Sequence, residues 1–258
     1  MRLSNYHTHT CFCDGKDSPE ELILEAIRLG CPEIGFSGHS HTPHEDYCMT
    51  VEGTAEYLRT LRSLRERYAD RIRVLIGIEQ DYYGDLPTDG YDYIIGSVHS
   101  MYKDGVYLCV DYTTEVFQRD VAEHYAGDYY AYAEDYYALV AQVREKTGCQ
   151  IIGHFDLVTK FNEGDRLFDT GHPRYRKAAL AALDRLCAEP VIFEINTGAI
   201  SRGYRTQPYP QDFILEELRR RKMPLLLSSD CHDKQKLLFG LEEQKRRVPE
   251  VREKLFGE

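Results

Sequence analysis

Side chains that can bind metal ions open this sequence. In the stretch NYHTHTCFCDG, His7 and His9 stand two residues apart, and Asp14 follows five residues after His9. In an extended segment, residues i and i+2 project to the same face, so the two imidazoles can converge on one point. Nitrogen and oxygen donors without thiolates suit Zn²⁺, Mn²⁺ or Fe. The spacing therefore predicts a metal site near the N-terminus, with Asp14 as an oxygen ligand.

The same kind of residue recurs where apolar stretches end. Glu79 follows the run VLIGI, and a carboxylate there would be costly to bury unpaired. Six of seven predicted strands carry such donors at or just beyond their ends, namely His7 and His9, His39, Glu79, His99, His154, and Asp230 with His232. A random sequence would not place donors at so many strand ends. We therefore predict that these donors meet in one site.

The elements that must position these donors are short apolar strands that alternate with helices. We expect strands opening at residue 3 and over residues 33–39, 73–79, 91–99, 150–154, 190–196 and 224–232. We expect helices over residues 18–30, 54–69, 114–124, 128–146, 173–188 and 210–221, and a C-terminal amphipathic segment over 240–255. Residues 101–111 contain the turn signal KDG and are interpreted as an excursion over one end of the sheet. This alternation predicts an α/β fold of parallel strands, and in a parallel barrel the functional groups collect at the carboxyl ends of the strands.

Length, charge and cysteine usage narrow the classes of protein. The 258 residues, which show no linker, predict a single domain over 1–258. The net charge is −11 and the basic residues form no concentrated patch, which argues against a nucleic-acid partner. No apolar run is long enough to cross a bilayer and no leader is evident, so we expect no membrane partner and a cytoplasmic location. The oligomeric state cannot be read from the sequence.

The eight cysteines are interpreted as reduced thiols, because they are spread through the chain without the spacing of a secreted disulfide framework. Cys11 and Cys13 lack the two-residue gap and the second pair that a zinc or redox site would need.

The number of donors predicts more than one ion. Six imidazoles and three carboxylates exceed what one ion with four to six ligands can use, so we expect two or three divalent ions bridged by Glu79 and Asp230. Such a cluster is electropositive inside an acidic protein, which favours a small anionic substrate.

These stretches resemble the PHP (polymerase and histidinol phosphatase) family, in particular its stand-alone histidinol-phosphatase branch. The similar motifs are HTH with CDGK, GFSGHSHTP, GIEQDY, IIGSVHSM, IIGHFDLVTKF, EINTGAISRGYRTQPYP and SSDCHD, which span residues 6–233. The resemblance implies a distorted, TIM-like (β/α)₇ barrel with a trinuclear metal site. Its ligand positions match His7, His9, Asp14, His39, Glu79, His99, His154, Asp230 and His232, with Asp17 as an alternative to Asp14.

The activity that the resemblance implies is hydrolysis of L-histidinol phosphate to histidinol and phosphate in histidine biosynthesis. The hypothesis is that a metal-activated hydroxide attacks phosphorus in line, and that Asp230 or His232 assists the leaving group. Arg202 and Arg205 are candidates to grip the phosphate, and Lys160 is a weaker one. The ammonium group of the substrate could meet Glu194, Asp156 or tyrosine rings.

Three other functions stay open from the sequence. One is a PHP phosphoesterase acting on a nucleotide, a sugar phosphate or phosphotyrosine. A second is amidohydrolase-type C–N hydrolysis, for which no convincing lysine follows a middle strand. A third is a non-catalytic metal-binding module, whose mark would be lost ligands, and none is lost.

Overall fold

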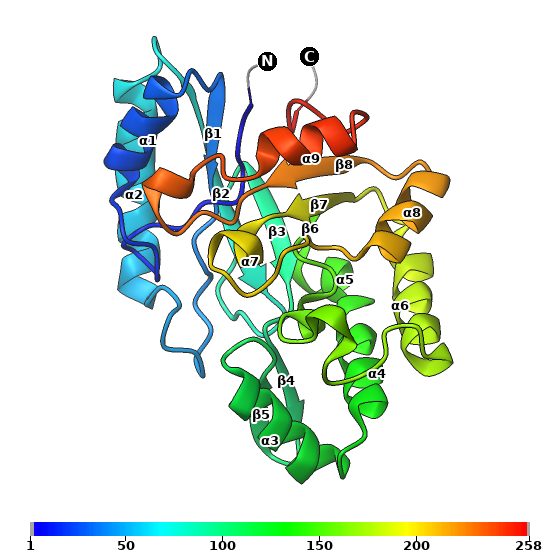
Figure 1. Ribbon diagram of the computed structural model, residues 1–258. Helices are drawn as coiled ribbons and strands as arrows, with labels where there is room; N and C mark the ends of the chain where they lie inside the picture. The colour runs from blue at the N-terminus through cyan, green and yellow to red at the C-terminus, as the bar shows by residue number, and fades with distance from the viewer. Residues whose placement is uncertain (1–2, 257–258) are drawn as a thin grey trace.

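A curled sheet of parallel strands forms the centre of the molecule in a computed structural model that describes residues 3–256 (Figure 1). Within these residues the sheet has six strands in the order β1-β2-β3-β6-β7-β8, and β4 and β5 form a separate hairpin. The strands are β1 (Glu33–Phe36), β2 (Arg73–Asp81), β3 (Tyr93–Ser97), β4 (Ser100–Lys103), β5 (Val106–Cys109), β6 (Ile151–Ile152), β7 (Ile192–Asn196) and β8 (Leu225–Ser228).

Helices cover the outer side of this sheet, with α1 and α2 at the β1 end and α6 and α8 toward the other (Figure 1). The helices of the described residues are α1 (Pro19–Arg28), α2 (Val51–Arg67), α3 (Thr114–Tyr125), α4 (Tyr129–Val140), α5 (Val143–Thr147), α6 (Pro173–Leu186), α7 (Gly198–Ser201), α8 (Asp212–Arg220) and α9 (Leu241–Arg247). Three 3-10 turns complete the described elements, η1 (Leu157–Thr159), η2 (Glu163–Asp165) and η3 (Lys234–Lys236). In the part of the chain between residues 3 and 256, no helix combines the length and the apolar character that a bilayer crossing needs. The predicted α/β fold is confirmed.

The N-terminal segment lies between the two edge strands of the sheet. Asn5 bridges Ile34 of β1, and Thr8 bridges Cys231 just beyond β8. The backbone N–H of His9 donates to the carbonyl of Cys231 at 2.8 Å. The predicted opening strand therefore takes the seventh place in the curled sheet, but it is held by isolated bridges rather than by a continuous ladder.

The inward face of the strands changes from apolar to polar along their length. On β2, Leu75 belongs to a small apolar cluster that also contains Tyr93, Ile192 and Leu226. Because side chains alternate between faces, Glu79, four residues after Leu75, projects to the same side. The same rule carries the inward face of β3 toward His99, of β7 toward Glu194, and of β8 toward Asp230. The fold thus packs apolar side chains at the beginning of the barrel and gathers polar ones at its carboxyl end.

Tyr93 fills the apolar part of this interior, and two glycines make room for it. Its hydroxyl donates to the carbonyls of Phe36 at 3.0 Å and Tyr6 at 2.5 Å. A Cβ atom at Gly35 would lie 2.4 Å from the Tyr93 hydroxyl, and one at Gly77 would lie 2.4 Å from its ring. The ring can cross the two neighbouring strands only because neither position carries a side chain.

Three helix boundaries differ from the prediction. The expected helix over 54–69 begins at Val51, because the Thr50 side chain accepts a hydrogen bond from Gly53 N–H and caps the helix earlier. The expected helix over 128–146 is two helices, α4 and α5, and no proline or glycine marks the break. The C-terminal segment is helical only to Arg247, because Pro249 disfavours a helical conformation at Val248.

The excursion after β3 is the β4–β5 hairpin, which extends away from the sheet together with α3 (Figure 1). Asp104 and Gly105 form its two-residue turn, both with positive φ, which matches the twist of the flanking strands. Val110 N–H then donates to the carbonyl of His99 at 2.8 Å. The hairpin therefore returns the chain to the polar end of the barrel.

Candidate metal centre

All nine predicted donor residues meet at the carboxyl end of the barrel. Among the residues that the structure describes, they form four overlapping groups whose ligand atoms lie within 4.8 Å of one another. The groups are His9, Asp14, His39 and His232; His7, His9 and Asp230; His7, Glu79 and His154; and His39, Glu79 and His99. The shared members make this arrangement compatible with a multinuclear divalent metal site.

Glu79 is the centre of the cluster. Its Oε2 lies 3.0 Å from His39 Nδ1, 3.2 Å from His7 Nε2 and 3.5 Å from His9 Nε2. Its Oε1 lies 2.9 Å from His154 Nε2. Ligands held at about 2.0–2.2 Å around one tetrahedral ion are separated by roughly 3.3–3.6 Å, so these spacings are close to those of donors sharing ions.

Three ligand atoms of this cluster are buried without a hydrogen-bond partner. They are Glu79 Oε2, His7 Nε2 and His9 Nε2. Orphaned polar atoms are costly in an interior. Divalent ions would satisfy all three atoms, so the donor set fits metal.

Asp230 is the second central carboxylate. Its Oδ1 lies 3.2 Å from His9 Nε2 and 3.5 Å from His232 Nδ1, and its Oδ2 accepts a hydrogen bond from Arg202 at 3.0 Å. The backbone at Asp230 is left-handed, with φ of 49°, a conformation that aspartate tolerates better than most residues. A Cβ atom at Gly198 would lie 2.6 Å from the Asp230 side chain, so the glycine leaves the space that this carboxylate occupies.

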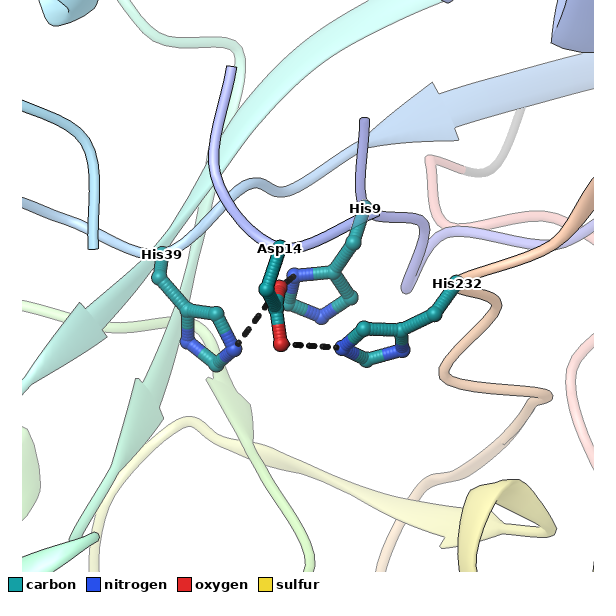
Figure 2. A group of neighbouring side chains, drawn as sticks. All are labelled: His9, Asp14, His39 and His232. Carbon is teal, nitrogen blue, oxygen red and sulfur yellow. Dashed lines mark ion pairs between the residues drawn. The ribbon is translucent and has the colours of Figure 1, made fainter. Parts of the chain in front are cut away.

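Asp14 supplies the third carboxylate. Figure 2 shows Asp14 among three imidazoles, with contacts of 3.7 Å to His9, 3.7 Å to His39 and 3.1 Å to His232. The alternative residue, Asp17, pairs instead with the Lys234 side chain at 3.1 Å and accepts from the Lys234 backbone N–H. The geometry therefore favours Asp14 as the loop ligand.

The electrostatics of the cluster favour ionised carboxylates. Burial alone would raise the pKa of Glu79, but the imidazoles of His7, His39 and His99 outweigh it and hold this pKa well below its usual value. Burial likewise opposes ionisation of Asp230, and Arg202 and His7 reverse the effect and lower its pKa. Ionised carboxylates are the form that coordinates metal.

For His9, burial and the neighbouring His232 and His39 all lower the pKa, which favours a neutral imidazole. For His7, His39 and His99, burial is outweighed by the neighbouring carboxylates, which raise the pKa in the absence of metal. A neutral imidazole is the form that a metal ion requires.

Two carboxylates outside the predicted set orient the imidazoles. Glu194 Oε2 accepts from His7 Nδ1 at 2.9 Å, and Asp81 Oδ2 accepts from His99 Nδ1 at 3.1 Å. Each bond directs the Nε2 atom of the histidine toward Glu79. Asp81 was not singled out from the sequence, although its place two residues after Glu79 on β2 was a usable signal. For Glu194, the sequence predicts only a candidate contact with a substrate ammonium.

We expect Glu194→Gln to lower metal affinity and activity about 10- to 100-fold, because the amide weakens the bond that orients His7. Glu194 also accepts from Ser228 Oγ at 2.6 Å and from His154 N–H at 2.6 Å, so the substitution disturbs two ligands together. The measurement is metal content and turnover across a titration with added metal. Glu189→Gln, at an exposed position that precedes β7, is the matched control. Unchanged metal affinity in Glu194→Gln would contradict the orienting role.

A cleft of about 340 Å³ opens over the cluster. Its lining contains seven of the nine donors and, beside them, Tyr47, Cys109, Asp111, Tyr112, Leu157, Lys160, Arg202 and Tyr204. Of the predicted phosphate-binding residues, Arg202 and Lys160 therefore border the cleft. Arg205 is buried beside it, where its guanidinium donates to Thr159 Oγ1 at 2.6 Å and lies over the Tyr209 ring. Asp156 is fully buried and accepts from the backbone N–H of Gln211.

Known proteins are similar to this chain in sequence and in fold. The histidinol-phosphatase of Bacillus subtilis is 26% identical over 257 residues, which cover 90% of this chain and 94% of that protein. The probable histidinol-phosphatase of Schizosaccharomyces pombe is 28% identical over 261 residues, which cover 90% and 81%.

Two solved structures have the same fold. A candidate histidinol phosphatase of Listeria monocytogenes has a TM-score of 0.80 at 20% identity, covering 93% of this chain and 99% of that one. The histidinol phosphate phosphatase of Lactococcus lactis, solved with zinc, L-histidinol and phosphate, has a TM-score of 0.68 at 23% identity, covering 96% and 93%.

The model of the PHP domain matches residues 5–198, about three quarters of the chain. That match includes His7, His9, Asp14, His39, Glu79, His99 and His154, and the sheet continues from it to β8, which Asp230 and His232 follow. The chain belongs to the PHP domain family.

Proposed function

We propose that this protein hydrolyses L-histidinol phosphate to L-histidinol and phosphate, a step of histidine biosynthesis. The observation that carries the proposal is the convergence of nine metal-capable donors under one open cleft. The names of the relatives support the choice of substrate, since both curated relatives described above are called histidinol-phosphatases.

The metal ligands that we propose are His7, His9, Asp14, His39, Glu79, His99, His154, Asp230 and His232, holding two or three divalent ions of Zn, Mn or Fe. Ions bound there would lower the pKa of a water toward neutrality and polarise the phosphoryl oxygens. The chain's own contribution is to fix the donors with buried carboxylates, and to place Arg202 beside them. Asp230 and His232, both bordering the cleft, are the proposed groups for assisting departure of the alkoxide.

Arg202 is the phosphate-binding residue that the geometry favours most. Its Nη2 donates to Asp230 Oδ2 at 3.0 Å and its Nη1 lies 2.9 Å from His232 Nδ1, so the guanidinium borders the metal donors directly. An arginine side chain has five N–H donors, so N–H groups that do not contact Asp230 or His232 can donate to phosphoryl oxygens. Lys160 is a second candidate with one N–H to spare after two bonds to Asp111. Arg205 would have to leave Thr159 to reach a ligand.

We expect Arg202→Ala to raise the KM for the phosphomonoester about 10- to 100-fold, the equivalent of about 1.5–3 kcal/mol for hydrogen bonds to a charged group. Steady-state kinetics and elemental analysis of the same preparation measure the two effects separately. Arg59→Ala, on the exposed face of α2, is the control. An unchanged KM in Arg202→Ala would contradict a role of Arg202 in phosphate binding. A loss of metal would show that Arg202 supports metal binding instead.

The substrate itself is tested by phosphate release from L-histidinol phosphate against a panel of nucleotides, sugar phosphates and phosphotyrosine. We expect the highest kcat/KM for L-histidinol phosphate. A higher value for another small phosphomonoester would assign the same site to that alternative substrate class.

We further propose that the chain is one domain. The support is that Thr8, near the start, bridges Cys231, near the end, so distant parts of the sequence complete one sheet.

A further inference from the structure

One carboxylate in the cleft is not among the metal donors. The carboxylates that line the cleft are Asp14, Glu79, Asp111 and Asp230, and among the described residues three of these belong to the metal-capable groups. Asp111 is the fourth. It follows β5 by two residues, so the hairpin, rather than the sheet, brings it to the site.

Lys160 holds Asp111 in place through two hydrogen bonds. Its Nζ donates to the Asp111 carbonyl at 2.7 Å and to Oδ2 at 3.1 Å, and it lies 4.6 Å from the centre of the Tyr204 ring. The lysine side chain is 8% exposed, whereas the aspartate side chain is 21% exposed. Both residues line the cleft, and the carboxylate is the more exposed member of the pair.

Asp111 keeps the charge and the lone pairs to bind a second cation. Burial opposes ionisation, but the Lys160 ammonium outweighs it and lowers the pKa of the Asp111 carboxyl well below its usual range. A carboxylate offers about four acceptor positions. Its side-chain oxygens receive Lys160 and the thiol of Cys109, at 3.5 Å, which leaves acceptor positions for a ligand.

The surroundings of Asp111 suit an organic cation. Tyr47, Tyr112 and Tyr204 line the same cleft, and aromatic faces attract ammonium groups. The metal donors and Arg202 are proposed to bind the phosphate of a substrate. Asp111 and the three tyrosines are then left to contact the alcohol that departs.

We propose that Asp111 selects phosphomonoesters whose leaving group carries an ammonium, by accepting a hydrogen bond from it, and that Lys160 is the positioning residue that holds Asp111. This inference rests on the proposed phosphomonoesterase function and adds the group that recognises the leaving alcohol. It assigns the substrate ammonium to Asp111 rather than to Glu194 or Asp156, which are buried and do not line the cleft.

The test compares two esters that differ only in the ammonium, 2-aminopropyl phosphate and propyl phosphate. The wild-type protein should prefer the amino ester at least about tenfold in kcat/KM. Asp111→Asn should lower kcat/KM for the amino ester about 10- to 100-fold, mainly through KM, and should change that for propyl phosphate by less than about twofold. Asp104→Asn, in the exposed turn of the same hairpin, should leave both unchanged.

Retained turnover of propyl phosphate and retained metal content show that Asp111→Asn is folded. Equal losses on both esters, or no loss on the amino ester, would overturn the proposal. Absence of a preference in the wild-type protein would overturn it without any variant. If the amino ester is preferred but L-histidinol phosphate is not hydrolysed, the role of Asp111 stands and the proposed natural substrate fails.

Discussion

Glu79→Gln is expected to reduce phosphate release about a thousandfold or more. The Glu79 carboxylate lies within 3.5 Å of imidazole nitrogens from His7, His9, His39, His99 and His154. Glutamine has nearly the same volume, but it removes one negative charge and directs an N–H₂ group at atoms that should face a cation. Metal ions contribute several kcal/mol of charge stabilisation in phosphoryl transfer, and each 1.36 kcal/mol is a factor of ten in rate.

The measurement is kcat/KM for L-histidinol phosphate together with the number of ions per chain. Glu56→Gln, at an exposed position on α2, is the control: it makes the same chemical change away from the metal donors. We expect the Glu79 variant to lose metal and turnover together. Full metal occupancy with near-normal turnover would show that Glu79 bridges no ion.

Removal of metal by a chelator is expected to abolish activity and to lower the melting temperature by about 5–10 °C. Ions present at roughly 100 times their dissociation constant stabilise the folded state by about 2.7 kcal/mol, and a chain of this size shifts by about 2–4 °C per kcal/mol. The reason lies in the buried atoms without hydrogen-bond partners, Glu79 Oε2, His7 Nε2 and His9 Nε2, which bound ions would satisfy.

Thermal melts of the chelated and the reconstituted protein measure this effect. Adding Zn²⁺, Mn²⁺ or Fe²⁺ back should restore both the melting temperature and phosphate release, and the order of recovery would identify the metal. An activity that survives complete chelation would contradict a metal-dependent reaction.

The fold was largely predictable because its strands are short, apolar and separated by amphipathic helices. The strand ends were predictable for the same reason, since Glu79 and His99 interrupt runs of buried residues. The opening strand was harder, because residues 5–9 pair through isolated bridges that depend on β1 and on the segment after β8. The break between α4 and α5 was not predictable, because no breaker residue marks it.

The metal donors could be predicted from their repeated position after strands, whereas of the residues that orient them only Asp81 had a usable signal. From the sequence, Glu194 is a buried strand residue with no sign of its partner. That partner, His7, lies 187 positions earlier in the sequence. Asp111 gives no local signal, because its place in the cleft depends on the turn of the hairpin and on Lys160. The expected cytoplasmic location and the absence of a nucleic-acid partner stay predictions.

Diffraction from crystals of the purified protein, recorded at the absorption edges of zinc, manganese and iron, tests the central claim most directly. We predict two or three anomalous peaks at the carboxyl end of the barrel, with Glu79 and Asp230 each within coordination distance of more than one. A single peak, or none, in protein that hydrolyses phosphomonoesters would contradict the account.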